Sequence, residues 1–290
     1  MIIGIMSAKS HHYHPTRRLM EAAKGMGHKA ILVDPRKLFL GVDDGGLRIG
    51  FLTKPVRADI IMPRIGGTIK EYSLTMIRHF ELSGIRLINN YDAVMLTRNK
   101  FLTLQTLILK GISVPESRYV SNWFNFDRAV SELGGYPLVI KTTHGRQGRG
   151  VQLVASMDKS RARLEGLLNT GQGLLIQKFI PPDKRRDIRV MVVGKRIVGA
   201  MSLMPRKGDF RANIHLHGSA EKVRPTNRMS TLAINASRAL GLDISGVDMI
   251  QEKDGTLRVI DVNYSPGFKG LEKCTGIDVA SEIIRYVTGS

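Results

Sequence analysis

The sequence predicts a mixed fold, with an α/β domain followed by α+β segments, and three observations support this prediction. An apolar run at 2–5 precedes helical spacing of apolar residues over 17–25 and a second apolar run at 30–33, which together indicate a βαβ unit. Later apolar runs are separated by tight turns such as Gly194-Lys-Arg, which is typical of antiparallel strands. With 290 residues, of which 42% are hydrophobic, the chain is long enough for two or three small domains and a sizeable core.

The first domain is predicted to be a parallel α/β domain that spans residues 1–92. Its later elements are a strand at 58–62, a helix over 69–83 and a strand at 85–88. In such domains the ligand-facing loops lie at the carboxyl ends of the strands, so residues 7–14 and 63–67 are candidate substrate loops. The first loop contains three histidines without an acidic or cysteine residue nearby, and we therefore expect a loop there in preference to a metal site.

The rest of the chain is predicted to form two α+β domains, residues 93–180 and 181–290. The elements of the first are an amphipathic helix from Lys100, strands at 136–141 and 150–154, a helix over 159–168 and a strand at 174–179. The elements of the second are strands at 188–193 and 197–201, a helix over 231–240, and strands at 246–251 and 257–262. A cleft between the two domains would suit a ligand.

The positive net charge of the chain indicates that its partners are anions. There are 44 lysine and arginine residues against 25 aspartate and glutamate residues, and the net charge of +19 attracts nucleotides, nucleic acids and acidic peptides or amino acids. The densest basic run, at 184–186, is most simply a solvated loop. The single cysteine, Cys274, excludes an internal disulfide. The apolar runs are too short to span a bilayer and the first residues lack signal-peptide features, so we expect a cytoplasmic protein without a membrane partner.

A glycine-rich loop follows the strand predicted at 136–141. Three glycines follow Lys141 in this loop, at Gly145, Gly148 and Gly150. Their backbone N–H groups can approach an anion where side chains would obstruct it. The loop lacks the Gly-Lys-Ser/Thr ending of a P-loop, and a strand follows it where a dinucleotide-binding motif would have a long helix. The pattern indicates a hairpin that folds over phosphates or, alternatively, a glycine-rich turn without a ligand.

Two late strands carry side chains with oxygen atoms. Asp261 and Asn263 are two residues apart on one predicted strand and therefore point to the same face, and a hairpin brings Asp248 beside them. Oxygen-bearing side chains on one surface suit Mg²⁺, with Mn²⁺ as an alternative ion. The other interpretation is a set of hydrogen-bonded polar residues. Because two carboxylates buried together without a cation are costly, the pattern favours the metal site.

Arginine residues provide candidate groups for the chemistry. Arg211 lies in a glycine-rich loop, and Asp187 and Arg189 lie on one face of a predicted strand. A guanidinium can form two hydrogen bonds to a carboxylate or a phosphate at once. Arg189 is therefore a candidate for binding a reacting group, and its alternative role is a surface ion pair with Asp187.

Together, these segments resemble the ATP-grasp superfamily and, within it, the RimK-type glutamate ligases, over nearly the whole chain. The motifs that carry the resemblance occur in this order: Pro63-Arg-Ile-Gly66, Arg98-Asn-Lys100, Lys141 with its glycine loop, Gln177-Lys-Phe-Ile180, Asp187-Ile-Arg189, Gly208-Asp-Phe-Arg-Ala-Asn213, Gly246-Val-Asp248, Asp261-Val-Asn263 and Glu272-Lys-Cys-Thr-Gly-Ile-Asp278. The resemblance implies an ATP-grasp fold preceded by an N-terminal pre-ATP-grasp parallel α/β domain.

The resemblance also implies roles for individual residues. For the nucleotide, it implies phosphate binding by Lys100 and Lys141, adenine binding by backbone groups of Gln177, Lys178, Phe179 and Ile180, and ribose binding by Asp187. For the metal, it implies one or two Mg²⁺ ions held by Asp248, Asp261 and Asn263. For the reacting phosphate and carboxylate, it implies binding by Arg189, Arg211 and Asn213.

The implied reaction is an ATP-dependent ligation. In the family, an acceptor carboxylate attacks the γ-phosphate of ATP, and the amine of an amino acid then displaces phosphate from the acylphosphate. The implied partners are glutamate and an acidic protein or peptide C-terminus, such as that of a ribosomal protein, and the family implies a homo-oligomer, often a tetramer. The same chemistry on a small cofactor or with another amino acid is an alternative.

A different class of function also fits the basic charge. A nucleic-acid- or ribosome-binding protein without catalytic turnover could keep the same fold, although the sequence lacks a basic stripe with interleaved aromatic residues. The sequence departs from the family pattern at Lys178 and Asp261, where the family tends to have glutamate. It also departs at 201–205, which lacks the arginines expected before the Gly208-Asp-Phe-Arg loop, and at 215–218, where His-Leu-His-Gly replaces a His-Arg-Gly-Gly pattern. The sequence therefore leaves the acceptor open.

Overall fold

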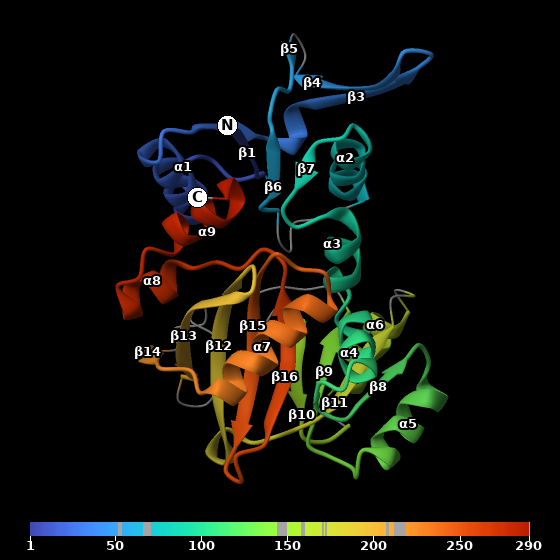
Figure 1. The fold of residues 1–290 in the computed structure, drawn as a ribbon. Coiled ribbons are helices and arrows are strands. Elements are labelled where there is room, and N and C mark those ends of the chain that lie inside the picture. The colour runs from blue at the N-terminus through green and yellow to red at the C-terminus, as the bar shows by residue number, and fades with distance from the viewer. Residues whose placement is uncertain are drawn as a thin grey trace.

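The computed structural model describes residues 1–51, 54–65, 71–143, 150–157, 160–169, 171, 173–206, 209–211 and 219–289. It contains an N-terminal domain, a central domain and a C-terminal domain, each with its own main sheet (Figure 1). No helix within these ranges is long and apolar enough to cross a membrane.

The main sheet of the N-terminal domain is parallel, as predicted. Its strands, in the spatial order β2-β1-β6-β7, are β2 (Lys29–Val33), β1 (Ile2–Met6), β6 (Ile60–Pro63) and β7 (Arg86–Leu87). Two helices, α1 (His14–Gly25) and α2 (Glu71–Leu82), follow β1 and β6 in the chain. Helix α1 begins three residues before the predicted start, because Pro15 fits the first turn of a helix.

The N-terminal domain also contains an antiparallel sheet that was not predicted. After the short helix η1 (Pro35–Lys37), the strands β3 (Leu38–Asp43), β4 (Gly46–Phe51) and β5 (Lys54–Pro55) form an arm that projects from the domain (Figure 1). Leu38 and Leu40 pair with apolar residues of β4 and pack against the domain core, whereas Val42 at the tip is 80% exposed. The predicted parallel α/β domain is therefore confirmed in its main sheet, and the β3-β4-β5 arm is an antiparallel addition to it.

The central domain is an antiparallel sheet with its own hydrophobic core. Its strands, in the order β10-β9-β11-β8, are β10 (Val151–Val154), β9 (Leu138–Thr142), β11 (Leu174–Lys178) and β8 (Ser117–Val120). Helices α5 (Trp123–Glu132) and α6 (Arg161–Leu168) pack on this sheet and share its core. The three predicted strands and the predicted helix are present, and β8 and α5 are additional.

The C-terminal domain contains five antiparallel strands in the order β14-β13-β12-β15-β16. They are β14 (Ser219–Val223), β13 (Arg196–Met204), β12 (Arg185–Val193), β15 (Ile244–Glu252) and β16 (Leu257–Asn263), and η3 (Pro182–Lys184) precedes them. One face is covered by α7 (Asn227–Ala239) and by α4 (Lys100–Leu109). The other face is covered by α8 (Lys269–Thr275) and α9 (Val279–Thr288). The predicted boundaries at 92 and 180 stay predictions.

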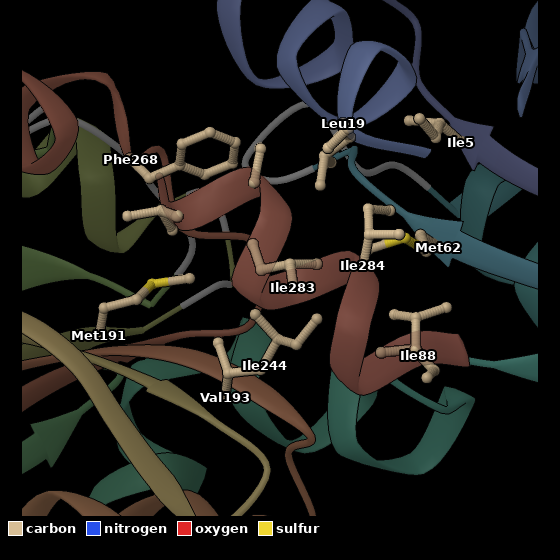
Figure 2. Close-up of a cluster of buried hydrophobic side chains, with 14 of the residues drawn as sticks. Ile5, Leu19, Met62, Ile88, Met191, Val193, Ile244, Phe268, Ile283 and Ile284 are labelled. Atoms are coloured by element: carbon tan, nitrogen blue, oxygen red, sulfur yellow. The ribbon is translucent and has the colours of Figure 1, made fainter. Parts of the chain in front are cut away.

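Helix α9 connects the two ends of the chain through a shared core. Figure 2 shows Ile283 and Ile284 of this helix between side chains of the N-terminal domain, such as Ile5 and Met62, and side chains of the C-terminal sheet, such as Val193. All of these residues are at most 2% exposed. The N-terminal domain and the C-terminal sheet are therefore joined by one continuous core.

A buried amide strengthens the same junction. Asn89 follows β7 and is 2% exposed, and its Nδ2 donates hydrogen bonds to the carbonyl oxygens of Ile244 and Tyr264, both at 2.8 Å. Its Oδ1 accepts hydrogen bonds from the backbone N–H groups of Asp243 at 2.7 Å and Ile244 at 2.9 Å. Helix α3 (Tyr91–Arg98) begins immediately afterwards, with Asn90 as its N-cap. The four hydrogen bonds of Asn89 therefore reach the start of β15 and the residue that follows β16.

Candidate active site

The three predicted metal ligands lie together on β15 and β16. Strand pairing sets Asp248 opposite Asp261 and Gly246 opposite Asn263. Asn263 Nδ2 donates a hydrogen bond to Asp248 Oδ2 at 3.2 Å. The structure thus brings two carboxylates and an amide onto one surface, and this donor set is one that suits Mg²⁺. Their role as metal ligands stays a prediction.

Each carboxylate of this group is paired with a cation from another part of the chain. Arg189 donates from Nε to Asp248 Oδ1 at 2.5 Å and from Nη2 to Asp248 Oδ2 at 2.7 Å, because β12 and β15 are adjacent in the sheet. Lys100 Nζ lies 2.5 Å from Asp261 Oδ2. Lys100 is the first residue of α4, and its N–H donates to the carbonyl oxygen of Thr143, the residue that follows β9. The pairs neutralise carboxylates that would otherwise repel one another.

Lys141 lies close to this group but has no carboxylate partner among the described residues. Its Nζ donates to Gln177 Oε1 at 2.7 Å, and Gln177 Nε2 in turn donates to Ser117 Oγ at 2.9 Å. Burial, together with the positive charge of Lys100, lowers the pKa of Lys141 to about 8. The Lys141 ammonium group is desolvated, and its hydrogen-bond partner is a neutral amide without a negative charge. Binding of an anion to this group is therefore favourable.

Of the three glycines in the predicted glycine loop, Gly150 lies within the described residues. Its φ angle is +79°, and a Cβ atom at this position would lie 2.3 Å from Thr142 Oγ1. Gly150 O also accepts a hydrogen bond from the N–H of Thr142 at 2.9 Å, which continues the pairing of β9 and β10. Both the backbone conformation and the close approach require glycine here. Gly145 and Gly148 lie outside the described residues.

The segment predicted to hold the adenine, residues 177–180, spans the end of β11 and the two residues after it. The N–H of Lys178 donates to the carbonyl oxygen of Glu116 at 3.0 Å. The carbonyl oxygen of Ile180 accepts a hydrogen bond from Arg185 Nη1. The ring of Phe179 meets the ring of Phe210 edge to face, with 6.0 Å between the ring centres. The placement of adenine on this segment stays a prediction.

Arg185 is a residue of the site that the sequence reasoning missed. Besides its bond to Ile180, Arg185 donates from Nε to Asp187 Oδ2 at 3.0 Å and from Nη2 to the carbonyl oxygen of Phe210 at 2.9 Å. Its side chain is only 9% exposed. Burial raises the pKa of Asp187, and the adjacent Arg185 charge opposes that rise. The interpretation of residues 184–186 as a solvated loop is therefore wrong for Arg185.

Two further interpretations are also wrong. The alternative role of Arg189, a surface pair with Asp187, is excluded because Arg189 pairs with Asp248 and Asp187 pairs with Arg185. The second is the prediction of a loop for all three histidines of residues 7–14. His14 is instead the first residue of α1, and its Nε2 lies 3.2 Å from Oε2 of Glu272, a residue that is distant in sequence.

Arg211, which is predicted to bind the reacting phosphate and carboxylate, forms an ion pair with Asp209, two residues before it in the chain. Arg211 donates from Nε to Asp209 Oδ1 at 3.0 Å and from Nη2 to Asp209 Oδ2 at 2.8 Å. These bonds keep the pKa of Asp209 below its usual value. Arg211 lies one residue from Phe210, which Arg185 contacts, so the loop is connected to the segment after β11. Asn213 lies outside the described residues.

Comparisons with known proteins agree with this arrangement. A model of the RimK-like ATP-grasp domain matches residues 97–287, and a model of the RimK pre-ATP-grasp domain matches residues 1–94. A protein named probable alpha-L-glutamate ligase from Stenotrophomonas maltophilia (strain K279a) is 36% identical over 288 residues, which are 99% of this chain and 98% of that protein. A protein of the same name from Coxiella burnetii (strain RSA 493 / Nine Mile phase I) is 35% identical and covers 99% of this chain and 95% of its own length.

Solved structures show the same fold. A RimK domain protein ATP-grasp from Sphaerobacter thermophilus DSM 20745 has a TM-score of 0.76 at 24% identity, with all of both chains covered. A D-alanine–D-alanine ligase from Bacillus anthracis complexed with ATP has a TM-score of 0.73 at 19% identity, covering 100% of this chain and 96% of that one. The fold is therefore ATP-grasp, with the predicted N-terminal pre-ATP-grasp domain, and the chain belongs to the RimK-like ATP-grasp family.

Proposed function

We propose that this chain is an ATP- and Mg²⁺-dependent carboxylate–amine ligase that joins glutamate to a carboxylate of a protein or peptide acceptor. The observation that carries the proposal is the convergence of Asp248, Asp261 and Asn263 with the cations Lys100 and Arg189. Transfer of a phosphoryl group depends mainly on positioning and charge neutralisation. This site supplies negative and positive charges from three strands of one antiparallel sheet and from the start of α4.

The cations have distinct tasks in this proposal. Lys141 and Lys100 bind phosphate oxygens of the nucleotide, and Arg189 offsets the charge that develops as an acceptor carboxylate attacks the γ-phosphate. When bound, Mg²⁺ polarises the phosphate oxygens and neutralises part of their charge. The acceptor carboxylate becomes an acylphosphate as the bond between the β- and γ-phosphates breaks and ADP leaves. The amine of the amino acid then attacks the carbonyl carbon, loses a proton, and inorganic phosphate leaves. Closure of the site keeps water from the acylphosphate.

The acceptor is proposed to be an acidic C-terminus, such as that of a ribosomal protein. The net charge of +19 favours an acidic acceptor through long-range attraction. The names of the relatives that are 35–36% identical favour glutamate as the amino acid that is added.

The test measures ADP release from ATP and Mg²⁺ with each of the twenty amino acids. The acceptors are peptides with acidic C-termini, each compared with the same peptide carrying a C-terminal amide. Glutamate should stimulate ADP release only with the free carboxylate, and mass spectrometry should show increments of one glutamate residue. Absence of ADP and phosphate release above background with every pair would refute the ligase.

A matched pair of variants tests the metal site. Asp248→Asn removes one negative charge from the predicted metal ligands and is expected to abolish turnover. Asp254→Asn makes the same change at the exposed tip of the β15–β16 hairpin and should leave turnover unchanged. Near-normal turnover of Asp248→Asn would contradict the metal role of this residue.

A further inference from the structure

Arg64 is the first residue after β6, at the carboxyl edge of the parallel sheet in the N-terminal domain. Its N–H donates to the carbonyl oxygen of Met6 at 2.7 Å, which fixes its backbone beside the end of β1. Ligands of open parallel sheets bind at this edge. The position of Arg64 is therefore one from which a side chain can meet a ligand.

The guanidinium of Arg64 reaches the C-terminal part of the chain. Its Nη2 donates to the carbonyl oxygen of Pro266 at 2.5 Å, and its Cζ lies 5.9 Å from the centre of the Phe268 ring. Pro266 follows the predicted metal ligand Asn263 by three residues. Arg64 thus joins the N-terminal sheet to the loop that leaves the predicted metal site.

Arg64 has no counter-ion in the part of the chain that the structure describes. Its Nε is buried and has no hydrogen-bond partner there, and its guanidinium forms no ion pair with a described carboxylate. The first turn of α1, which follows the neighbouring strand β1, contains no acidic residue. Burial lowers the pKa of Arg64 to about 10, so it stays charged at neutral pH. A partly desolvated cation with an unused N–H is unfavourable unless a ligand binds to it.

A second buried nitrogen without a partner lies against the same aromatic ring. The His14 ring centre is 5.7 Å from that of Phe268, and His14 Nδ1 is buried without a hydrogen-bond partner among the described residues. Burial lowers the pKa of His14, which favours the neutral ring. With Nε2 facing Glu272, a neutral ring carries its proton on Nε2 and leaves Nδ1 as an acceptor.

We infer that Arg64 is a specificity-determining residue that binds a carboxylate of the amino-acid substrate, with His14 as a hydrogen-bond acceptor for the same substrate. This inference rests on the proposed ligase function and specifies the substrate class as an amino acid with a free carboxylate. Only the amine of glutamate forms the new bond, so both of its carboxylates remain free for recognition. A guanidinium binds such a group through charge-assisted hydrogen bonds.

The test compares the kinetics of Arg64→Met with those of Arg57→Met, which changes an exposed arginine of the same domain. We expect Arg64→Met to raise the KM for glutamate by about 10- to 100-fold, the effect of losing charge-assisted hydrogen bonds, while the KM for ATP is unchanged. Arg64→Lys should lie between wild type and Arg64→Met, because lysine keeps the charge without the planar fork. Glutamine lacks the side-chain carboxylate of glutamate, and the α-amide of glutamate lacks the α-carboxylate. The wild type should discriminate against the analogue that lacks the carboxylate bound by Arg64. Arg64→Met should no longer discriminate against that analogue, which identifies the carboxylate.

The outcomes separate this inference from the proposed function. Methionine removes a buried unpaired charge at similar length, and a cooperative thermal transition at or above that of the wild type would show that the variant is folded. Equal KM values for glutamate in wild type and Arg64→Met would overturn the inference and leave the ligase function standing. If the wild type turned over no amino acid, the proposed function would fail, and calorimetric titration of glutamate into the protein with Mg²⁺ and ADP would decide the inference. No binding, or equal binding by Arg64→Met, would overturn it.

Discussion

Replacement of Lys141 with methionine should stabilise the ligand-free protein while it weakens nucleotide binding. The pKa of Lys141 lies at about 8, against 10.5 for an ordinary lysine. A gap of this size corresponds to about 3 kcal/mol of destabilisation by the buried charge at neutral pH. Methionine also loses the hydrogen bond to Gln177, which costs about 1–2 kcal/mol because the amide oxygen is left without its donor. The net gain in the free energy of unfolding is then about 1–2 kcal/mol at pH 7.

The pH dependence of this gain has a defined sign. The folded-state pKa of Lys141 is below its unfolded-state value, so the buried charge destabilises the wild type fully below pH 8. Between about pH 8 and 10.5 the folded state releases its proton before the unfolded state does, and the wild type recovers stability relative to the variant. The difference between the two proteins should therefore fall by roughly 2 kcal/mol from pH 7 to pH 10. The charges nearest to Lys141, on Lys100 and Asp261, are the same in both proteins.

Urea unfolding at pH 7 and pH 10 measures this difference. The control is Lys110→Met, which changes an exposed lysine after α4 and should leave stability nearly unchanged at both values of pH. Calorimetric titration with ATP and Mg²⁺ should show weaker binding by Lys141→Met and unchanged binding by the control. A less stable variant at pH 7, or a difference that does not depend on pH, would refute the reasoning.

Two further predictions concern the junction of the domains and the metal site. Asn89→Ala removes four hydrogen bonds, two of them fully buried, and should lower the free energy of unfolding by about 3 kcal/mol, whereas Asn90→Ala removes only a helix cap and should cost about 1 kcal/mol. Equal losses in urea unfolding would show that Asn89 does not act as a structural connection. Lys100→Met frees Asp261 from its ion pair, so calorimetry should detect tighter binding of Mg²⁺ without nucleotide and weaker binding of ATP with Mg²⁺. Unchanged Mg²⁺ affinity would contradict competition between Lys100 and the metal for Asp261.

Much of the fold could be predicted because its patterns are local. The helix from Lys100 and the strands at 246–251 and 257–262 have periodicities that a short window detects, and each lies close to its predicted bounds. The β3–β4 arm also had a local pattern, since apolar residues alternate over 38–42 and 47–51 around an Asp-Gly turn. That pattern was missed, and it could have been found.

The partners of the charged residues could not be predicted in the same way. Asp248 and Asp261 lie on consecutive strands joined by a hairpin, so their proximity follows from the sequence. The pairing of Arg189 with Asp248 requires β12 to lie beside β15, although β13, β14 and α7 separate them in the chain. Arg185 became buried because residues before and after it converge on its guanidinium. Contacts of this kind depend on strand order, which hydrophobic periodicity does not determine.

The position of α9 has a consequence for the synthesis of the protein. Ile3 and Ile5 are made long before Ile283, Ile284 and Val287, and part of their burial depends on these later residues. At about 5–20 residues per second, roughly 15 to 60 seconds separate the translation of these segments. During that interval one apolar face of the first sheet lacks its partner helix. The core of the N-terminal domain therefore stays incomplete until α9 has been made, and chaperones that bind exposed apolar surface can act before α9 docks.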